Sequence, residues 1–467
     1  MFQFGQIVRT LGNWTLPAYL ALGLLVGGAS REGILANGIL QLAGACILIW
    51  CALDTRLPGP DKRARWLVWS AALLMTCLVL QLVPLPPEVW TRLPGRDFVQ
   101  EGFDLLGRDG LPWLPLSVAP QETLGGLLRF IPPLAVFVLT YKTATRREGN
   151  RTLFVLISVA MLSALLGMVQ IFDGRESVFY FWDITNHGHA VGLMANANHQ
   201  AILLVSVLPF CTVYLSRLKI HSDMGDTDAG QLLFVTLAIL ILVIGIIIAG
   251  SLAGYILLGP VAAMSFLLYR GRRVRGLDVL AGLMGALAVA CLGWWLSFSP
   301  ILPALGVTNL SDTELGRLNS WRLTLKAASD FYPFGSGLGS FERLIPLYED
   351  PATITGRFLN HTHNDYLELW LELGVAGIVI MTIVLLAVLR LAVVAWASDG
   401  GERIRMKKAG SIAAIAVFLH SIVDYPLRTE TMAMLVAFAL GQLATDTLKR
   451  QRRVSGSEAA SSAHIVL

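Results

Sequence analysis

The chain has 467 residues, of which 55% are hydrophobic and only 15% are charged, and its mean hydropathy is +0.64. Soluble domains usually carry about 25% charged residues and lack repeated apolar runs of about twenty residues. The composition therefore excludes an ordinary soluble domain and indicates a polytopic membrane protein. The net charge of +4 does not indicate a nucleic-acid partner, because the basic residues lie in short connections between apolar runs.

Twelve apolar runs are long enough to cross about 30 Å of hydrocarbon. The predicted fold class is therefore an all-α integral membrane protein with twelve transmembrane helices. The first run is expected to be a retained helix rather than a signal peptide, because no cleavage-like site precedes it. The predicted spans lie at residues 14–28, 33–53, 66–84, 121–141, 152–172, 194–215, 231–249, 252–269, 277–297, 372–396, 409–424 and 430–447.

Lysine and arginine in the short connections predict the orientation. With twelve spans, six basic groups fall on one face, which the positive-inside rule makes cytoplasmic. Both termini are then cytoplasmic as well. The groups lie within residues 56–65, 142–151, 217–219, 270–275, 403–408 and 449–453.

The long connections fall on the opposite face, at residues 85–120, 173–193 and 298–365. The first is rich in Pro, Trp and Gly, which predicts an interfacial loop or a short amphipathic helix. The predicted organisation has N-terminal membrane helices over residues 1–190. A second membrane domain over 191–430 contains the 298–365 loop, and residues 431–467 form the last helix and a tail.

Polar residues crowd the start of the tenth span, where they are costly unless they serve a chemical purpose. A helix that begins at Asn364 and runs on into this span would place three carboxylates on one face, seven residues from first to last. The polar residues of the stretch are His361, His363, Asn364, Asp365, Tyr366, Glu368 and Glu372.

Three interpretations of this stretch stay open. It can be a capped helix with a solvated acidic face and no chemical role. His363 can be a general base in an outer cavity, because an imidazole titrates near neutrality and suits deprotonation of a sugar hydroxyl. His361, His363 and Asp365 can instead bind a metal ion, although histidines two residues apart suit a strand better than a helix.

Two arginines, Arg317 and Arg322, follow the ninth span. The planar, permanently charged guanidinium matches phosphate oxygens, and two of them can neutralise the charge that develops on a diphosphate leaving group. Pairing with lipid headgroups or carboxylates is the alternative. Arg129, inside the fourth span, either extends to the interface or binds a phosphate.

Two further polar pairs lie at outer helix ends. Asn198 and His199 begin the sixth span, where they either tie helices together or line the cavity. His420 and Asp424 close the eleventh span four residues apart, so they can meet on one helical face. A structural pair is the favoured interpretation of these two, and a contact to substrate is the alternative.

These residues resemble the O-antigen ligase and polymerase superfamily of bacterial envelope glycosyltransferases. His363-Asn364, nine residues, then Gly374 and Gly377 follow the family pattern H-[NSQ]-x9-G-x-x-[GTY]. Residues 317–321 and 334–341 are similar to the family's loop, and residues 198–199 and 420–426 match weaker pieces. The resemblance covers residues 190–430 and implies a GT-C-type fold whose active site lies on the large outward loop.

The resemblance also implies an activity. Such proteins transfer a glycan from undecaprenyl diphosphate to an acceptor hydroxyl at the periplasmic face of the bacterial inner membrane, with inversion and without a metal or other cofactor. The acceptor is the lipid A core for a ligase and another repeat unit for an O-antigen or exopolysaccharide polymerase. The complete His-Asn pattern favours the ligase.

Carried over to this chain, His363 activates the acceptor while Arg317 and Arg322 hold the diphosphate. Contacts to substrate are expected from His361, Asn364, Asp365, Tyr366, Asn198, His199 and Arg343. The expected partners are thus the lipid-linked donor, the glycan acceptor and membrane lipids.

The chain departs from the family at one position. Many members carry Ser-Arg between the seventh and eighth spans, whereas Leu252 stands here at the place of that phosphate-binding arginine. Arg129, Arg343 or Arg357 is expected to replace it. Two other classes stay open: a transporter of lipid-linked glycan, which predicts inverted repeats, and a metal-dependent membrane hydrolase.

Overall fold

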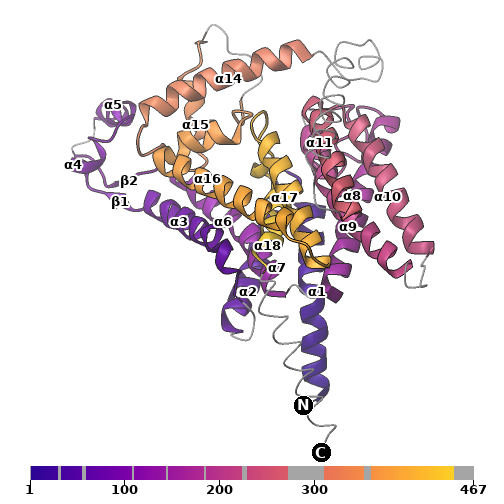
Figure 1. The fold of residues 1–467 in the computed structure, drawn as a ribbon. Coiled ribbons are helices and arrows are strands. Elements are labelled where there is room, and N and C mark those ends of the chain that lie inside the picture. The colour runs from indigo at the N-terminus through magenta and orange to yellow at the C-terminus, as the bar shows by residue number, and fades with distance from the viewer. Residues whose placement is uncertain are drawn as a thin grey trace, which may run out of the picture.

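The computed structural model describes residues 2–29, 33–54, 59–107, 110–143, 146–182, 186–222, 229–271, 310–351 and 359–445. Over these residues the fold is almost wholly helical, with one small sheet of two strands (Figure 1). The N-terminal half contains α1 (Phe2–Val26), α2 (Ile34–Leu53), η1 (Lys62–Ala64), α3 (Arg65–Gln81), β1 (Pro84–Leu85), α4 (Pro87–Trp90), α5 (Asp97–Leu105), β2 (Leu114–Pro115), α6 (Pro120–Arg129), α7 (Ile131–Thr143), α8 (Arg146–Asp173) and α9 (Ala197–Ser222).

The C-terminal half carries the residues singled out in the sequence. Its elements are α10 (Ala229–Ala249), α11 (Leu252–Arg270), α14 (Leu310–Asp330), α15 (Phe341–Leu344), η2 (Ile345–Leu347), α16 (Asp365–Ala397), α17 (Glu402–His420), η4 (Pro426–Arg428) and α18 (Glu430–Ala444).

Eight helical segments among the described residues are long and apolar enough to cross a membrane. They match the second to eighth and the tenth predicted spans, which confirms an all-α membrane protein. The segments are Ile34–Leu53, Lys62–Gln81, Pro120–Thr143, Gly149–Asp173, Ala197–Leu218, Ala229–Ala249, Leu252–Arg270 and Asp365–Ala397.

The other four predicted spans have different outcomes, so the count of twelve stays a prediction. The first and last correspond to shorter apolar helices, Trp14–Val26 and Glu430–Ala444. The eleventh lies on α17, whose first turns carry several lysines and arginines. The ninth, residues 277–297, lies outside the described residues.

Side-chain contacts join connections that the orientation places on the cytoplasmic face. Arg217 at the end of α9 forms an ion pair with Glu402 at the start of α17 (2.6 Å). Lys407, also on α17, lies 3.8 Å from Asp61 in the connection before α3. These three connections therefore lie on one face, as predicted. Which face is cytoplasmic stays a prediction from the positive-inside rule.

The long connections gather at the opposite end of the molecule. Figure 1 shows α4, α5, α14 and α15 at one end and the start of α1 at the other. Two hydrogen bonds connect the end of α3 to neighbouring segments here. The Gln81 side chain donates to the Glu372 carbonyl of α16 (2.8 Å), and the Ser117 amide, in the connection before α6, donates to the Gln81 carbonyl (2.9 Å). This end holds the candidate site.

Helix α18 runs through the centre of the bundle, where it packs against α7, α17 and α1. Its side chains are almost all buried, because neighbouring helices surround it. Glycines permit the close approach: a Cβ at Gly23 on α1 would lie 2.3 Å from Met434, and one at Gly441 would lie 2.6 Å from Thr140. Small residues at helix interfaces are typical of membrane bundles.

Helix α16 is broken at Gly374, so the prediction of one helix continuing from Asn364 into the tenth span is wrong. Gly374 has φ 58° and ψ −139°, a conformation that is accessible essentially only to glycine. The Val375 amide, free to turn at this break, donates to the Pro333 carbonyl (2.9 Å). Residues 365–373 therefore form a separate outer helix that is locked to the loop at Pro333.

Substitution of Gly374 by alanine tests this break. A Cβ there would lie 2.1 Å from the Pro333 carbonyl oxygen, and the φ/ψ region itself costs about 1–3 kcal/mol for a residue with a side chain. We expect Gly374→Ala to lower the melting temperature of the detergent-solubilised protein by several degrees, measured at a fixed scan rate.

Gly38→Ala is the matched control, because a Cβ at Gly38 in α2 meets no atom within 4 Å. Alanine has the higher helix propensity by about 1 kcal/mol, so this variant should be unchanged or slightly more stable. Equal melting temperatures for the two variants would contradict the role given to Gly374.

Candidate functional site

A largely buried arginine, Arg428, lies at the centre of the site and binds all three carboxylates of the outer part of α16. Its Nη2 lies 2.8 Å from Glu372 Oε2 and 3.5 Å from Glu368 Oε1, and its Nε lies 3.7 Å from Asp365 Oδ1. Burial lowers the pKa of the Arg428 guanidinium, but Glu368, Glu372 and Asp365 together raise it well above its usual range. The sequence prediction of one acidic face is confirmed, but that face is buried on Arg428 rather than solvated.

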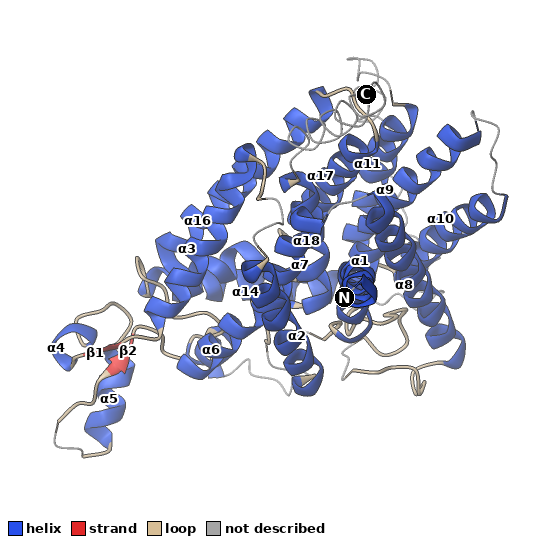
Figure 2. Ribbon diagram, turned by 90° about the horizontal axis from the view of Figure 1, so that it is seen from below, coloured by secondary structure: helices blue, strands red, loops and turns tan. Residues whose placement is uncertain are grey.

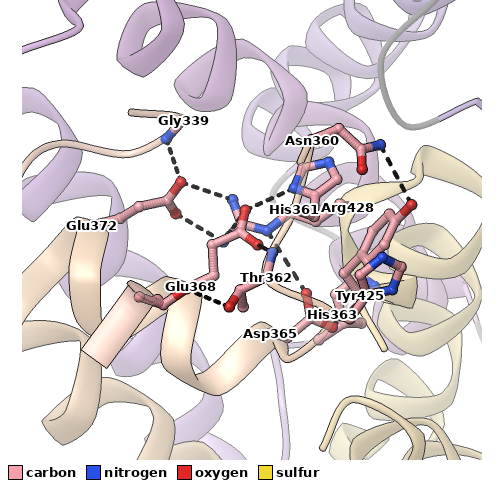
Figure 3. A network of polar contacts seen from close by, with 12 residues as sticks. Gly339, Asn360, His361, Thr362, His363, Asp365, Glu368, Glu372, Tyr425 and Arg428 are labelled. Atoms are coloured by element: carbon pink, nitrogen blue, oxygen red, sulfur yellow. Dashed lines mark hydrogen bonds and ion pairs between the residues drawn. The ribbon is translucent and has the colours of Figure 1, made fainter. Parts of the chain in front are cut away.

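Glu368 connects this cluster to residues 359–364, here called the histidine loop. Its Oε2 accepts a hydrogen bond from the Thr362 amide (3.0 Å), and its Oε1 lies 2.7 Å from His361 Nδ1. Figure 3 shows the carboxylates of Glu368 and Glu372 converging on Arg428, with His361 and Thr362 beside them. The position of the loop therefore depends on the charge cluster.

Glu372 connects the cluster to the glycine-rich loop, residues 334–339. Its Oε1 accepts a hydrogen bond from the Gly339 amide (2.7 Å), and its carbonyl accepts one from the Gly337 amide (2.9 Å). A side chain at Gly337, where φ is 106°, would lie 2.0 Å from Ser117 Oγ. The glycines are needed because backbone packs directly on backbone here.

His363 forms a pair with Asp424, which comes from the turn after α17. His363 Nδ1 lies 3.1 Å from Asp424 Oδ1, and the Asp424 side chain is fully buried while His363 is 25% exposed. The Tyr425 amide also donates to Asp424 Oδ1 (3.0 Å). With an ionised carboxylate as partner, Nδ1 carries the proton and Nε2 keeps its lone pair. This arrangement suits a general base.

The backbone of His363 is strained. Its φ of 56° is positive, an uncommon conformation for a residue with a side chain. The Trp321 indole donates to the His363 carbonyl (3.4 Å). The hydroxyl of Thr362, the preceding residue, hydrogen-bonds to that of Thr324. Strain of this kind persists only where neighbouring contacts impose it, and it clusters at functional sites.

Tyr425 is the common neighbour of three imidazoles. Its ring centroid lies 4.4 Å from that of His361 and 4.9 Å from those of His363 and His199. The Asn360 side chain donates to its hydroxyl (3.5 Å), and burial raises the pKa of the phenol. Tyr425 is therefore a neutral aromatic side chain that contacts both His361 and His363.

The two predicted clamp arginines lie on different faces of α14. Residues five apart on a helix are separated by about 140°, whereas residues four apart share a face. Arg317 shares the face of Trp321, which contacts His363, and its charge acts on His420. Arg322 is exposed. The structure thus brings Arg317, and not Arg322, to the histidine loop.

A cavity of about 700 Å³ extends from the charge cluster into the bundle. Its polar end includes His361, Arg428 and Arg129, and the His363 side chain is not part of the lining. Its apolar walls are formed by side chains that share one face on each of several neighbouring helices. They include Leu67, Leu74 and Leu78 of α3, Ile380 and Val384 of α16, and Ala433, Ala437 and Leu440 of α18.

The other residues expected to contact substrate already have partners within the chain. Asn364 caps α16 by accepting from the Tyr366 and Leu367 amides, and the Tyr366 hydroxyl donates to the Phe418 carbonyl (2.6 Å). Asp365 Oδ2 accepts from the Ser421 hydroxyl (2.8 Å). A role of these residues toward substrate stays a prediction.

The predicted residues on other elements are also placed. His199 Nε2 lies 3.9 Å from Asp424, and the Asn198 carbonyl accepts from His420 Nε2 (3.2 Å), so this helix start reaches the site. Arg343 is 71% exposed and pairs with Glu122 (2.9 Å).

The positions considered for the missing family arginine have different outcomes. Leu252 begins α11 directly after the capping residue Ser251. Of the three proposed replacements, Arg129 lines the cavity, Arg343 lies at the surface, and Arg357 lies outside the described residues.

The two histidines of the His361–His363 pair bind different carboxylates, Glu368 and Asp424. In the part of the chain that the structure describes, no group of three His, Cys, Asp or Glu side chains is arranged to hold a metal ion. The geometry thus gives the metal interpretation no support.

Residues 237–382 match the family model described as O-antigen ligase. The match supports the resemblance of this part of the chain to the O-antigen ligase and polymerase superfamily. The matched segment contains His363 and Arg317, while Asp424 and Arg428 lie beyond its end in the sequence. No curated protein matches the chain. The family associates the chain with O-antigen ligase or polymerase activity in general terms.

Sequence reasoning missed Arg428 and underrated Asp424 and Tyr425. Arg428 lies outside the predicted spans in a short connection, where basic residues are common and do not indicate a functional site. One signal was available: three carboxylates on one helical face at a membrane boundary require a cation, and Arg428 lies in the next outer connection.

Removal of the Arg428 charge tests the dependence of the site on this cluster. Arg428→Gln leaves three buried carboxylates without a cation, and the loss of one partner of a buried ion cluster costs about 3–5 kcal/mol. We expect a large fall in melting temperature and in the amount of folded protein, measured by fluorescence-detected gel filtration.

Arg343→Gln is the control, because it removes an arginine from an exposed ion pair worth about 1 kcal/mol or less. If both variants were equally stable, the Arg428 cluster would not hold the site together.

Proposed function

We propose that this protein transfers a glycan from undecaprenyl diphosphate to a sugar hydroxyl of an acceptor at the periplasmic face of the bacterial inner membrane. The observation that carries the proposal is the His363–Asp424 pair, in which a partly exposed imidazole has its Nδ1 bound by a fully buried carboxylate. The family match supports the class of reaction. The favoured acceptor is the lipid A core, which makes the protein a ligase; a growing glycan would make it a polymerase.

In the proposed reaction, His363 Nε2 removes the proton of the acceptor hydroxyl as its oxygen attacks the anomeric carbon of the donor. The bond from that carbon to the diphosphate oxygen breaks, and undecaprenyl diphosphate leaves with the electron pair. Asp424 keeps Nδ1 protonated and stabilises the imidazolium that forms. A single displacement of this kind inverts the anomeric centre.

The leaving diphosphate needs positive charge near the base. Arg317 meets this requirement better than Arg322, because it shares the α14 face that contacts the His363 backbone. Arg129 is a second candidate, because it lines the polar end of the cavity. The guanidinium of Arg428 is a poor candidate, since three carboxylates already surround it.

The cavity supports a lipid-linked substrate. It joins a polar end at His361 to walls of Leu, Ile, Val and Ala on spanning helices. Ligand sites for amphiphiles combine apolar walls with a few polar groups in this way. The cavity is lined by His361 but not by His363, and both imidazoles contact the Tyr425 ring, so we place the donor lipid in the cavity and the acceptor at His363.

Deletion of the gene, with complementation by variants, tests the proposal. Loss of the protein should leave a ligase mutant with bare core and with polymer still on its lipid carrier, whereas a polymerase mutant shows single-repeat decoration. His363→Ala and Asp424→Asn should fail to restore transfer, with rates lower by about 10²–10⁴, the usual contribution of a general base. Surface polysaccharide gels and an in vitro transfer assay measure this.

His187→Ala is the matched control, because His187 is an exposed histidine in another outer connection. It should complement fully at equal protein level. Normal decoration by His363→Ala would show that the assignment of the base is wrong.

The two arginines of α14 should differ. Arg317→Lys keeps the charge but loses the planar fork, so we expect transfer to fall about tenfold or more. Arg322→Lys and the exposed control Arg175→Lys should have smaller effects, measured as kcat/KM for the lipid-linked donor. Equal losses at all three positions would exclude a specific phosphate contact by Arg317.

A further inference from the structure

Residues 83–107 and 110–116, here called the arm, stand apart from the helical bundle. It leaves the bundle at the end of α3 and returns just before α6. At its base, β1 and β2 pair antiparallel, with Pro84 opposite Pro115 and Leu85 opposite Leu114. Figure 2 shows α4, α5 and the two strands extending sideways beyond α6.

The arm is an ordered unit. The Trp90 side chain is fully buried in it, with its indole donating to the Pro112 carbonyl (2.9 Å) and its ring 6.4 Å from that of Phe103. The buried Arg96 guanidinium donates to the Leu116 carbonyl. Gly95 lies against Phe331, which directly follows α14, because a Cβ there would lie 2.8 Å from the Phe331 ring. Its exposed side chains are therefore presented in a defined geometry.

Several large apolar side chains of this ordered unit are uncovered. Leu105 is 89% exposed, Leu106 70% and Trp113 65%, and Phe98 lies on the same side of α5 as Leu105, seven residues earlier. Asp97, Glu101 and Asp104, which are spaced four and three residues apart and are all exposed, form a separate acidic stripe, turned by about 90° from the stripe of Phe98 and Leu105 at 100° per residue. Helix α5 thus presents an exposed apolar stripe beside an exposed acidic one.

The position of the arm indicates what covers these apolar side chains. Both ends of the arm adjoin candidate membrane spans, Lys62–Gln81 and Pro120–Thr143. The exposed apolar side chains of Val79 and Leu80, at the end of α3, are followed by that of Val83 at the start of the arm. Short helices with one polar and one apolar side, accompanied by Trp, lie in the interfacial layer of membranes.

We propose that the arm is a membrane-interface anchor whose apolar side, formed by Phe98, Leu105, Leu106 and Trp113, lies in the outer interfacial layer of the bilayer. The acidic stripe of α5 then faces water. Because α3 and α6 both line the cavity, the anchor holds that wall of the cavity at a set depth in the membrane.

Site-directed spin labelling tests this in the full chain, with the five native cysteines replaced, reconstituted in vesicles of phosphatidylethanolamine and phosphatidylglycerol. Nitroxides at Leu105, Leu106 and Trp113 should collide several-fold more with oxygen than with a water-soluble nickel chelate. Labels at Asp97 and Asp104, the matched controls on the acidic stripe of the same helix, should show the reverse preference. Equal access of the nickel chelate to both sides would overturn the proposal.

A contact between two copies of the chain is the competing outcome. It would give a dipolar distance between labels at Leu105 that persists when the protein is diluted in lipid, and it would overturn membrane anchoring. A second variant does not depend on a label attached to α5. The double substitution Leu105→Ser with Leu106→Ser alters only exposed side chains. It should shift a label at Trp113 toward water if the face is anchored in lipid, and an unchanged label would contradict the anchor.

Discussion

The buried guanidinium of Arg428 makes the outer end of α16 possible. Three carboxylates on one side of a helix, at the boundary of a membrane, repel one another and lose hydration, which is unfavourable without a cation. Arg428 arrives from the connection between α17 and α18 and contacts all three. It thereby ties the last two helices of the bundle to the start of α16.

The same cluster positions the loops of the candidate site. Glu368 holds the Thr362 amide and His361, and Glu372 holds the Gly339 amide. His363 then lies between these contacts and the Trp321 indole, in a backbone conformation that it would not adopt alone. The proposed base is therefore preorganised by a network that does not itself take part in proton transfer.

Tyr425 contacts two imidazoles that have different surroundings. His361 lines a cavity with apolar walls among α3, α7, α16 and α18. His363 is paired with Asp424, and Trp321 of α14, which donates to its carbonyl, shares a helical face with Arg317. In the proposed reaction, this arrangement lets a lipid-linked donor in the cavity and a sugar acceptor at His363 approach the site from different directions.

The sequence by itself determined the class of fold and most of the spans, and its motif singled out His363 as the candidate base. These follow from local properties: apolar runs must match the bilayer thickness, and a short His-Asn pattern with two glycines at set spacing is read directly from the chain. It also predicted that Asp365, Glu368 and Glu372 share a face, because helical periodicity is local.

Only the tertiary structure decided which residues complete the site. Arg428 follows Glu372 by 56 residues, and Asp424 follows His363 by 61 residues, so no pattern of spacing predicts either contact. The break at Gly374 depends on the approach of the loop at Pro333. The different positions of Arg317 and Arg322 depend on which side of α14 meets the histidine loop. Such contacts arise from the packing of elements distant in sequence, which local periodicity does not encode.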